Sequence, residues 1–174
     1  MTHEREDPGV ESVAELDLQR YLGLWFEIGR LPMRFEDDDA VDVTAEYSLR
    51  DDGAVRVDNR CLDAERQPTQ ALGEARPDPE HAGRLRVSFL PAGLRWIPFT
   101  RADYWVLKID PDYRRARSAP RTHKCLWLLS RDPQVSAEVE AEYLAEAKRQ
   151  GFQLDQWIRP EQSGRHVDDA QFGS

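Results

Sequence analysis

Long apolar runs are missing from this chain of 174 residues. A helix that crosses a bilayer needs about 20 consecutive apolar residues, so none is predicted here. The first residues, MTHEREDPGVESVAEL, have neither the basic start nor the apolar segment of a secretory signal. From these two features we expect a soluble, cytoplasmic protein.

Cysteine and histidine are scarce, with two and four copies. We expect Cys61 and Cys125 to be reduced thiols, because two cysteines do not make a disulfide framework. The histidines are isolated, without CxxC or HxxxH spacing, so no metal site is predicted. P-loop, GxSxG and GxGxxG motifs are missing as well. The motif search therefore predicts no cofactor and no enzyme.

Positive charge is in deficit, since 24 basic residues face 33 acidic ones and the formal charge is −9. The basic residues are spread along the chain, so a nucleic-acid backbone would be repelled and we expect no nucleic-acid partner. The length and a hydrophobic content of 40% suit one domain with a real core.

Short segments in which β-branched and aromatic residues alternate with polar ones recur between residues 25 and 131. This alternation predicts strands. VTAEYSL, the turn DDG and AVRVDNRC read as a hairpin in which Val57, Asn59 and Cys61 share one face. Five further strands are predicted in QALGEAR, RLRVSFL, DYWVLKID, YRRARS and CLWLLSR. With a first strand from Trp25, the total is eight.

One helix is predicted, in SAEVEAEYLAEAKRQG after all the strands. Ser136 is a suitable N-cap, Val139, Tyr143 and Ala147 form an apolar stripe, and Gly151 ends the helix.

The predicted fold class is all-β, an eight-stranded antiparallel barrel with the C-terminal α-helix packed outside. A closed barrel is favoured over a two-sheet sandwich, because closure removes exposed strand edges. An eight-stranded barrel can enclose one small ligand, but it can also be filled by its own side chains. Both interpretations remain open at this stage.

Five segments in order, followed by one helix, resemble the lipocalins: GLWFEIGRLPMRFE, VTAEYSLRDDGAVRV, RLRVSF, DYWVL and LWLLSRDP. The resemblance is closest to the bacterial branch that is similar to apolipoprotein D, and it spans residues 16–160. It implies an up-and-down barrel, closed at one end and open at the other, that binds small hydrophobic molecules. Residues 1–15 and 161–174 are expected to be disordered segments.

The resemblance also implies a structural role for two residues at the closed end. Trp25 is expected to plug the barrel base, and Arg131 to pack across it through a cation–π contact. The acidic run at 36–39 then falls in the first loop, where we interpret it as a solvated loop tip and not as a calcium site.

Strand parity and the resemblance together predict the ligand-binding residues. Those expected to face the cavity are Tyr47, Val57, Asn59, Phe89, Trp105, Leu107 and Trp127. Those expected at its entrance are Met33, Phe35, Trp96, Ile97 and Phe99. The segment 90–102 is more apolar than a hairpin loop requires, so it either folds over the barrel end or makes a transient membrane-surface contact.

The predicted function is to bind and carry small hydrophobic molecules, fatty acids or lysophospholipids, in membrane lipid storage or transfer. An enzyme on a lipocalin barrel is the alternative, because Glu27 shares the parity of Trp25 and because His123 and Cys125 lie two apart. Many bacterial members of the family that the sequence resembles carry a lipoprotein signal, which makes the periplasm or outer membrane the alternative location. The sequence predicts no oligomeric state.

Overall fold

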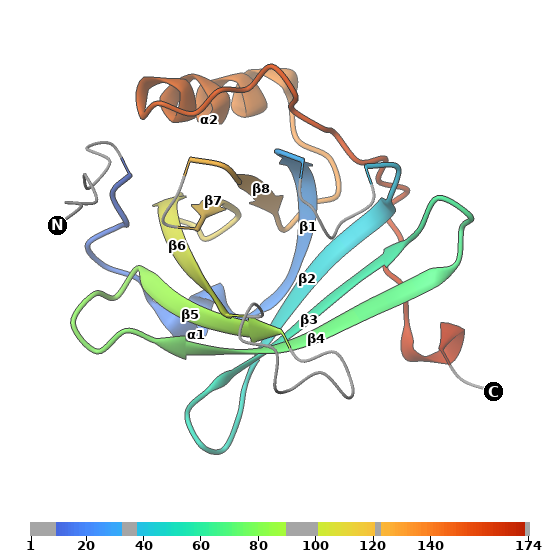
Figure 1. Ribbon diagram of the computed structural model, residues 1–174, viewed down its shortest axis with the longest axis horizontal. Helices are drawn as coiled ribbons and strands as arrows, with labels where there is room; N and C mark the ends of the chain where they lie inside the picture. The colour runs from blue at the N-terminus through green and yellow to red at the C-terminus, as the bar shows by residue number, and fades with distance from the viewer. Residues whose placement is uncertain (1–9, 33–37, 90–100, 121–122, 173–174) are drawn as a thin grey trace, which may run out of the picture.

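Eight antiparallel strands form a closed barrel in sequential order (Figure 1). The computed structural model describes residues 10–32, 38–89, 101–120 and 123–172. The strands are β1 (Gly23–Arg30), β2 (Val41–Leu49), β3 (Val55–Leu62), β4 (Pro68–Pro77), β5 (Arg84–Phe89), β6 (Arg101–Ile109), β7 (Arg115–Ala119) and β8 (Trp127–Ser130). β8 pairs with β1 from Phe26↔Ser130 to Arg30↔Trp127 and so closes the ring. The predicted all-β barrel and its eight strands are confirmed.

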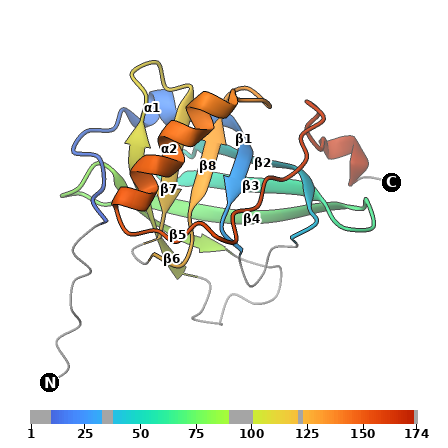
Figure 2. The ribbon, with the colours of Figure 1, turned by 90° about the horizontal axis from the view of Figure 1, so that it is seen from above.

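The predicted helix is α2 (Ala137–Arg149), which lies outside the barrel across β7 and β8 (Figure 2). The Ser136 hydroxyl accepts a hydrogen bond from the Val139 N–H at its start, and Gly151 follows its end with a φ of 96°. A four-residue helix, α1 (Leu18–Tyr21), precedes β1 and escaped the sequence analysis. No helix in the described ranges has the length and apolarity to cross a membrane.

α2 covers an apolar outer face of the barrel. Its Tyr143 packs with Phe26, Ile28 and Leu128, which point outward from β1 and β8. The buried Arg117 of β7 joins the same layer by donating hydrogen bonds to the helix and to the residue that caps it. The strands beneath α2 are therefore buried on both faces, which removes the polar alternation expected of a half-exposed strand.

The prediction that residues 161–174 are disordered is wrong for residues 161–172. The Gln162 side-chain amide donates to the carbonyls of Glu27 and Val43, at 2.8 and 2.9 Å. Ser163 donates to the Asp42 carboxylate from its backbone N–H at 2.7 Å and from its hydroxyl at 2.9 Å. We call residues 161–172 the C-terminal strap, because they run along the outside of the barrel wall and are held by polar contacts.

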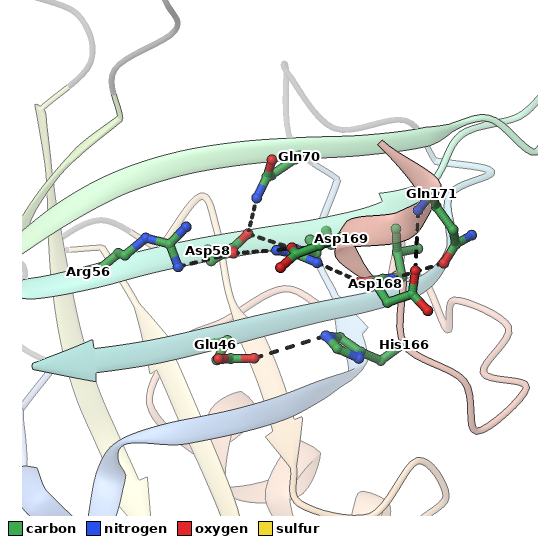
Figure 3. A network of polar contacts seen from close by, with 10 residues as sticks. Glu46, Arg56, Asp58, Gln70, His166, Asp168, Asp169 and Gln171 are labelled. Carbon is green, nitrogen blue, oxygen red and sulfur yellow. Dashed lines mark hydrogen bonds and ion pairs between the residues drawn. The ribbon is translucent and has the colours of Figure 1, made fainter. Parts of the chain in front are cut away.

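Arg60 holds the far part of this strap by pairing with Asp58 of β3 and with Asp169 of the strap, two residues that lie close together in Figure 3. Its guanidinium forms two hydrogen bonds with the Asp58 carboxylate and also donates to the Val167 carbonyl and to Asp169. Burial alone would raise the pKa of Asp58, but hydrogen bonds from Arg60 and Gln70 outweigh it and hold that pKa below its ordinary value. The strap ends in a short 3-10 helix, η2 (Asp169–Gln171).

The expected N-terminal disorder is likewise corrected for residues 10–15. The Val13 N–H donates to the Val106 carbonyl of β6 at 2.8 Å, and the Ser12 hydroxyl accepts from Arg84 at 3.1 Å. A Cβ on Gly83 would come within 2.5 Å of the Val13 carbonyl oxygen, so the segment lies directly against this turn.

The two cysteines are thiols in the structure, as predicted. Cys61 lies on β3 and Cys125 just before β8, and β1 and β2 separate these strands in the ring. We expect a thiol reagent to titrate two groups per chain under denaturing, non-reducing conditions. A value near zero would mean that the cysteines are bridged and that the strand order is wrong.

Candidate ligand-binding site in the barrel interior

The inside of the barrel is lined by apolar side chains from all eight strands. Alternate residues of each strand point to the same face, so one face of every strand supplies this lining. The buried members of the interior cluster are Tyr21, Trp25, Ala45, Tyr47, Val55, Val57, Ala75, Leu85, Val87, Val106, Ala116 and Leu129, and Tyr104 and Trp127 pack against them.

Trp25 occupies the base of the barrel and is fully buried. Its indole N–H donates to the Tyr21 carbonyl of α1 at 2.9 Å. The guanidinium carbon of Arg131 lies 3.7 Å from the centre of the indole ring, a cation–π geometry. The structure thus places these two residues together in the arrangement that the lipocalin resemblance implies.

Arg131 also connects three separate segments at this end. Its guanidinium donates to the carbonyls of Arg20, Leu22, Leu24 and Tyr113, at 2.8, 2.9, 2.9 and 3.2 Å. These acceptors belong to α1, the start of β1 and the β6–β7 turn. One side chain therefore fixes the elements that close the base.

Three tyrosine hydroxyls meet inside the barrel above this base. The Tyr104 oxygen lies 2.6 Å from that of Tyr21 and accepts from Tyr47 at 3.2 Å. Burial is the main cause that raises the pKa of all three, and it holds those of Tyr21 and Tyr47 well above the ordinary 10.0. The phenols remain protonated donors and acceptors at neutral pH.

The orientation predicted for Trp105 and Leu107 is wrong, because both point out of the barrel. Arg84 stacks on the Trp105 ring at 3.9 Å, and Leu107 packs in the cluster beneath α2 that contains Ala147. The residues of β6 that pack in the interior include Tyr104, Val106 and Ile109. Large aromatic or aliphatic residues therefore stand on both faces of this strand, and the alternation in DYWVL does not reveal which face is inside.

Of the other predicted cavity residues, Tyr47, Val57 and Trp127 lie together in the interior. Asn59 of β3 lies directly opposite Ala45 of β2, which points into the interior, so Asn59 is on the inner face of the barrel wall as well. The Asn59 side-chain oxygen is buried and has no hydrogen-bond partner in the part of the chain that the structure describes. Their role in ligand binding stays a prediction.

The remaining predicted residues cannot be placed. The Phe89 side chain and the five entrance residues lie outside the described residues: Met33, Phe35, Trp96, Ile97 and Phe99. The same holds for most of the segment 90–102.

A buried ion pair, which the sequence analysis did not find, lies on the inner face of β1. Arg30 Nη1 donates to Glu27 Oε2 at 2.8 Å, and the two residues are 0% and 4% exposed. Glu27 pairs with Leu129 and Arg30 with Trp127, two residues of the inner lining. Regular alternation would put residues 27 and 30 on opposite faces, but a bulge between Glu27 and Gly29 brings both inside.

The outer side of this bulge explains its sequence. Ile28 and Gly29 both point outward, and a Cβ on Gly29 would come within 2.2 Å of the Trp157 ring. Glycine is thus required for Trp157 to pack here, and this glycine was the available signal for the bulge.

A separate hollow of about 420 Å³ lies between the start of β2, the β3–β4 turn and the strap. Its lining includes Asp38, Asp39, Arg66, Arg159 and Glu161. A hollow with so many charged side chains does not suit the apolar acyl chain of a lipid. The described residues also contain no group of three or more side chains suited to hold a metal ion.

Comparison with known proteins agrees with the barrel and its closed base. The family model for a lipocalin-like domain matches residues 16–162. This chain belongs to the lipocalin family. The resemblance read from the sequence is confirmed, and the family is one that binds small hydrophobic ligands.

Two relatives of this lipocalin match it over most of their length. It is 39% identical over 160 residues to the outer membrane lipoprotein Blc of Citrobacter freundii, covering 90% of this chain and 85% of the relative. It is 34% identical over 165 residues to temperature-induced lipocalin-1 of Arabidopsis thaliana, covering 94% and 87%. The structure of insecticyanin from Manduca sexta has the same fold, with a TM-score of 0.69, 19% identity and coverage of 94% and 87%.

Proposed function

We propose that this lipocalin binds and carries a fatty acid or lysophospholipid inside its barrel, in membrane lipid storage or transfer. The observation that supports this most is the inner wall, to which all eight strands contribute apolar side chains. Trp25 and Arg131 close one end of that wall, so a ligand enters from the other. An eight-stranded barrel can enclose one small ligand, and predominantly apolar linings are typical of sites that bind such ligands.

The proposed location is the periplasm or the outer membrane. Citrobacter freundii Blc is named an outer membrane lipoprotein, and this supports the second compartment considered from the sequence. The comparisons do not support the cytoplasm, which was the first expectation.

We infer a binding protein and not an enzyme. The inward carboxylate of Glu27 is engaged by Arg30, which makes it a poor general base. Burial raises the pKa of the Cys125 thiol and so disfavours the thiolate that a nucleophile needs. His123 lies within 2.8 Å of the Gln150 carbonyl oxygen and against the Phe152 ring, so its ring packs beside the end of α2.

The proposal is tested by native extraction and by titration. Protein purified without detergent from its own host is extracted, and the lipids are identified by mass spectrometry. Delipidated protein is then titrated with a fluorescent fatty acid, which unlabelled fatty acid and lysophospholipid should displace. We expect saturable binding of one lipid per chain, and protein that neither retains a lipid nor binds the probe would contradict the proposal.

Two tryptophans of opposite orientation test whether the interior is the site. Trp127→Ala is expected to weaken probe binding about tenfold, because a large rigid ring of the inner wall is lost. Trp105→Ala, the matched control on the outer face, should leave the affinity unchanged. Equal effects of the two substitutions would place the ligand elsewhere.

A further inference from the structure

The three phenols inside the barrel carry more hydrogen-bond donors than they can use among themselves. Tyr104 Oη accepts from Tyr47 at 3.2 Å and lies 2.6 Å from Tyr21 Oη. Each contact between two hydroxyls uses one hydrogen, so two contacts among three hydroxyls leave one hydrogen without an acceptor. The cluster is therefore one acceptor short.

Ser118 of β7 does not remove this surplus. It lies opposite Val106 and Trp127 and so faces the interior. It is fully buried and influences the Tyr104 phenol, but its hydroxyl oxygen makes no hydrogen bond of normal geometry to a described residue. A bond between Ser118 and Tyr104 would leave the count unchanged, because the serine brings a hydrogen as well as an oxygen. At least one O–H group is thus unpaired in an apolar interior, which is costly.

Tyr104 is the phenol that retains the spare hydrogen. The hydrogen of Tyr47 is used in its bond to Tyr104. Tyr21 is 2% exposed, so no group from outside the cluster reaches it, and its hydrogen is donated to Tyr104. Tyr104 itself is partly exposed although it packs in the interior, and its ring stacks on Trp127, which is also partly exposed. Its O–H group is therefore the donor that a molecule inside the barrel can contact.

The barrel interior is filled near its base and open toward its mouth. On the inner face of β4, from base to mouth, Ala75 is 2% exposed, Gly73 is partly exposed and Ala71 is exposed. Gly73 lies in one row with Val57 of β3 and Tyr47 of β2. The phenol cluster thus lies where the filled base gives way to the open part of the interior, and it forms the floor of that part.

An uncharged oxygen suits this floor better than an anion. The charges of Glu27 and Arg131 act on Tyr47 in opposite directions, so these neighbours favour neither sign. The protein as a whole carries a formal charge of −9 and repels anions. One phenol donor does not compensate for the removal of a carboxylate from water, but it satisfies a hydroxyl or ketone oxygen.

We propose that Tyr104 donates a hydrogen bond to an uncharged oxygen at the buried end of an aliphatic chain, a hydroxyl or a ketone. The ligand is then an oxygenated fatty acid whose carboxylate remains in water at the mouth of the barrel. Its chain packs on the apolar inner wall. This inference rests on the proposed function and specifies the chemistry at the buried end of the ligand.

Fatty acids that differ only at the far end of the chain test the proposal. Dodecanoate, ω-hydroxydodecanoate and (ω−1)-oxododecanoate are titrated by calorimetry below their critical micelle concentrations. The same three compounds from the decanoate to the hexadecanoate series allow for the depth of the interior. At the length that binds most tightly, we expect the hydroxyl and the ketone to improve affinity about fivefold over the plain acid. The ketone accepts but cannot donate, so its result identifies the protein as the donor.

Removing the phenol hydroxyls should reverse the preference. In Tyr47→Phe with Tyr104→Phe, a buried ligand hydroxyl has no partner, so the ω-hydroxy acid should bind about tenfold more weakly than the plain acid. Tyr104→Phe alone should shift the ratio in the same direction, which provides a result if the double variant does not fold. Tyr143→Phe, the same substitution on the outside of the barrel, is the control and should keep the wild-type ratio.

The outcomes separate this inference from the proposed function. If the wild type prefers the plain acid or shows no preference at any length, or if the double variant keeps the preference, Tyr104 is not the donor, although lipid binding stands. If the wild type binds oleoyl lysophosphatidylcholine but none of the acids, the inference fails and the proposed function stands. If it binds none of these lipids, the proposed function fails as well.

Discussion

Replacing Arg131 with alanine is expected to lower the free energy of unfolding by about 3 kcal/mol. The substitution removes four hydrogen bonds to backbone carbonyls and the cation–π contact with Trp25. The backbone carbonyls of α1 and of the β6–β7 turn then lack the hydrogen-bond donor that they share, and the face of the Trp25 indole is no longer covered by the guanidinium. Chemical denaturation monitored by tryptophan fluorescence measures the loss.

Two controls separate the role of Arg131 from its charge. Arg114→Ala removes a neighbouring cation with an exposed ion pair to Asp132, and it should cost less than about 1 kcal/mol. Arg131→Lys retains the charge but not the planar fork, so its stability should lie between wild type and alanine. Lipid affinity should change little in all three variants, because the residue lies at the base. An Arg131→Ala protein as stable as wild type would contradict the assignment of this side chain to the closure of the barrel.

Deleting residues 161–174 is expected to destabilise the barrel by about 4 kcal/mol. The deletion leaves the Asp42 carboxylate, in a residue 7% exposed, without its two donors from Ser163. It also removes the Gln162 amide that joins the backbones of β1 and β2. Arg60 loses the Val167 carbonyl, and the wall beneath the buried Val167 becomes exposed.

Substitutions within the strap distinguish the contribution of its anchoring side chains to stability from the contribution of the whole segment. Gln162→Ala with Ser163→Ala should reproduce about half of the loss, whereas Arg165→Ala, at an exposed position, should have no measurable effect. A truncated protein with an unchanged midpoint of thermal unfolding would mean that the strap contributes nothing, as expected for a disordered tail.

Local signals in the sequence determined the strands, the helix and the turn between β2 and β3. In a strand, residues two apart in the sequence share a face. The Ser136 hydroxyl caps α2 by accepting a hydrogen bond from Val139, only three positions later. The DDG turn and Gly151 likewise depend on their own backbone conformations. Such short-range preferences are readable without the fold, and the lipocalin resemblance added the contact between Trp25 and Arg131.

The tertiary structure alone decided which face of β6 is inside, because large aromatic or aliphatic residues stand on both faces: Tyr104 packs in the interior, and Trp105 packs in the outer cluster that contains Ala147 of α2. It also decided the position of Arg30, since one bulge reverses the parity of every residue after it. The strap depends on hydrogen bonds between residues more than 100 positions apart, such as Ser163 and Asp42. Contacts of that separation form only when the chain has closed the barrel, and no pattern within a few residues encodes them.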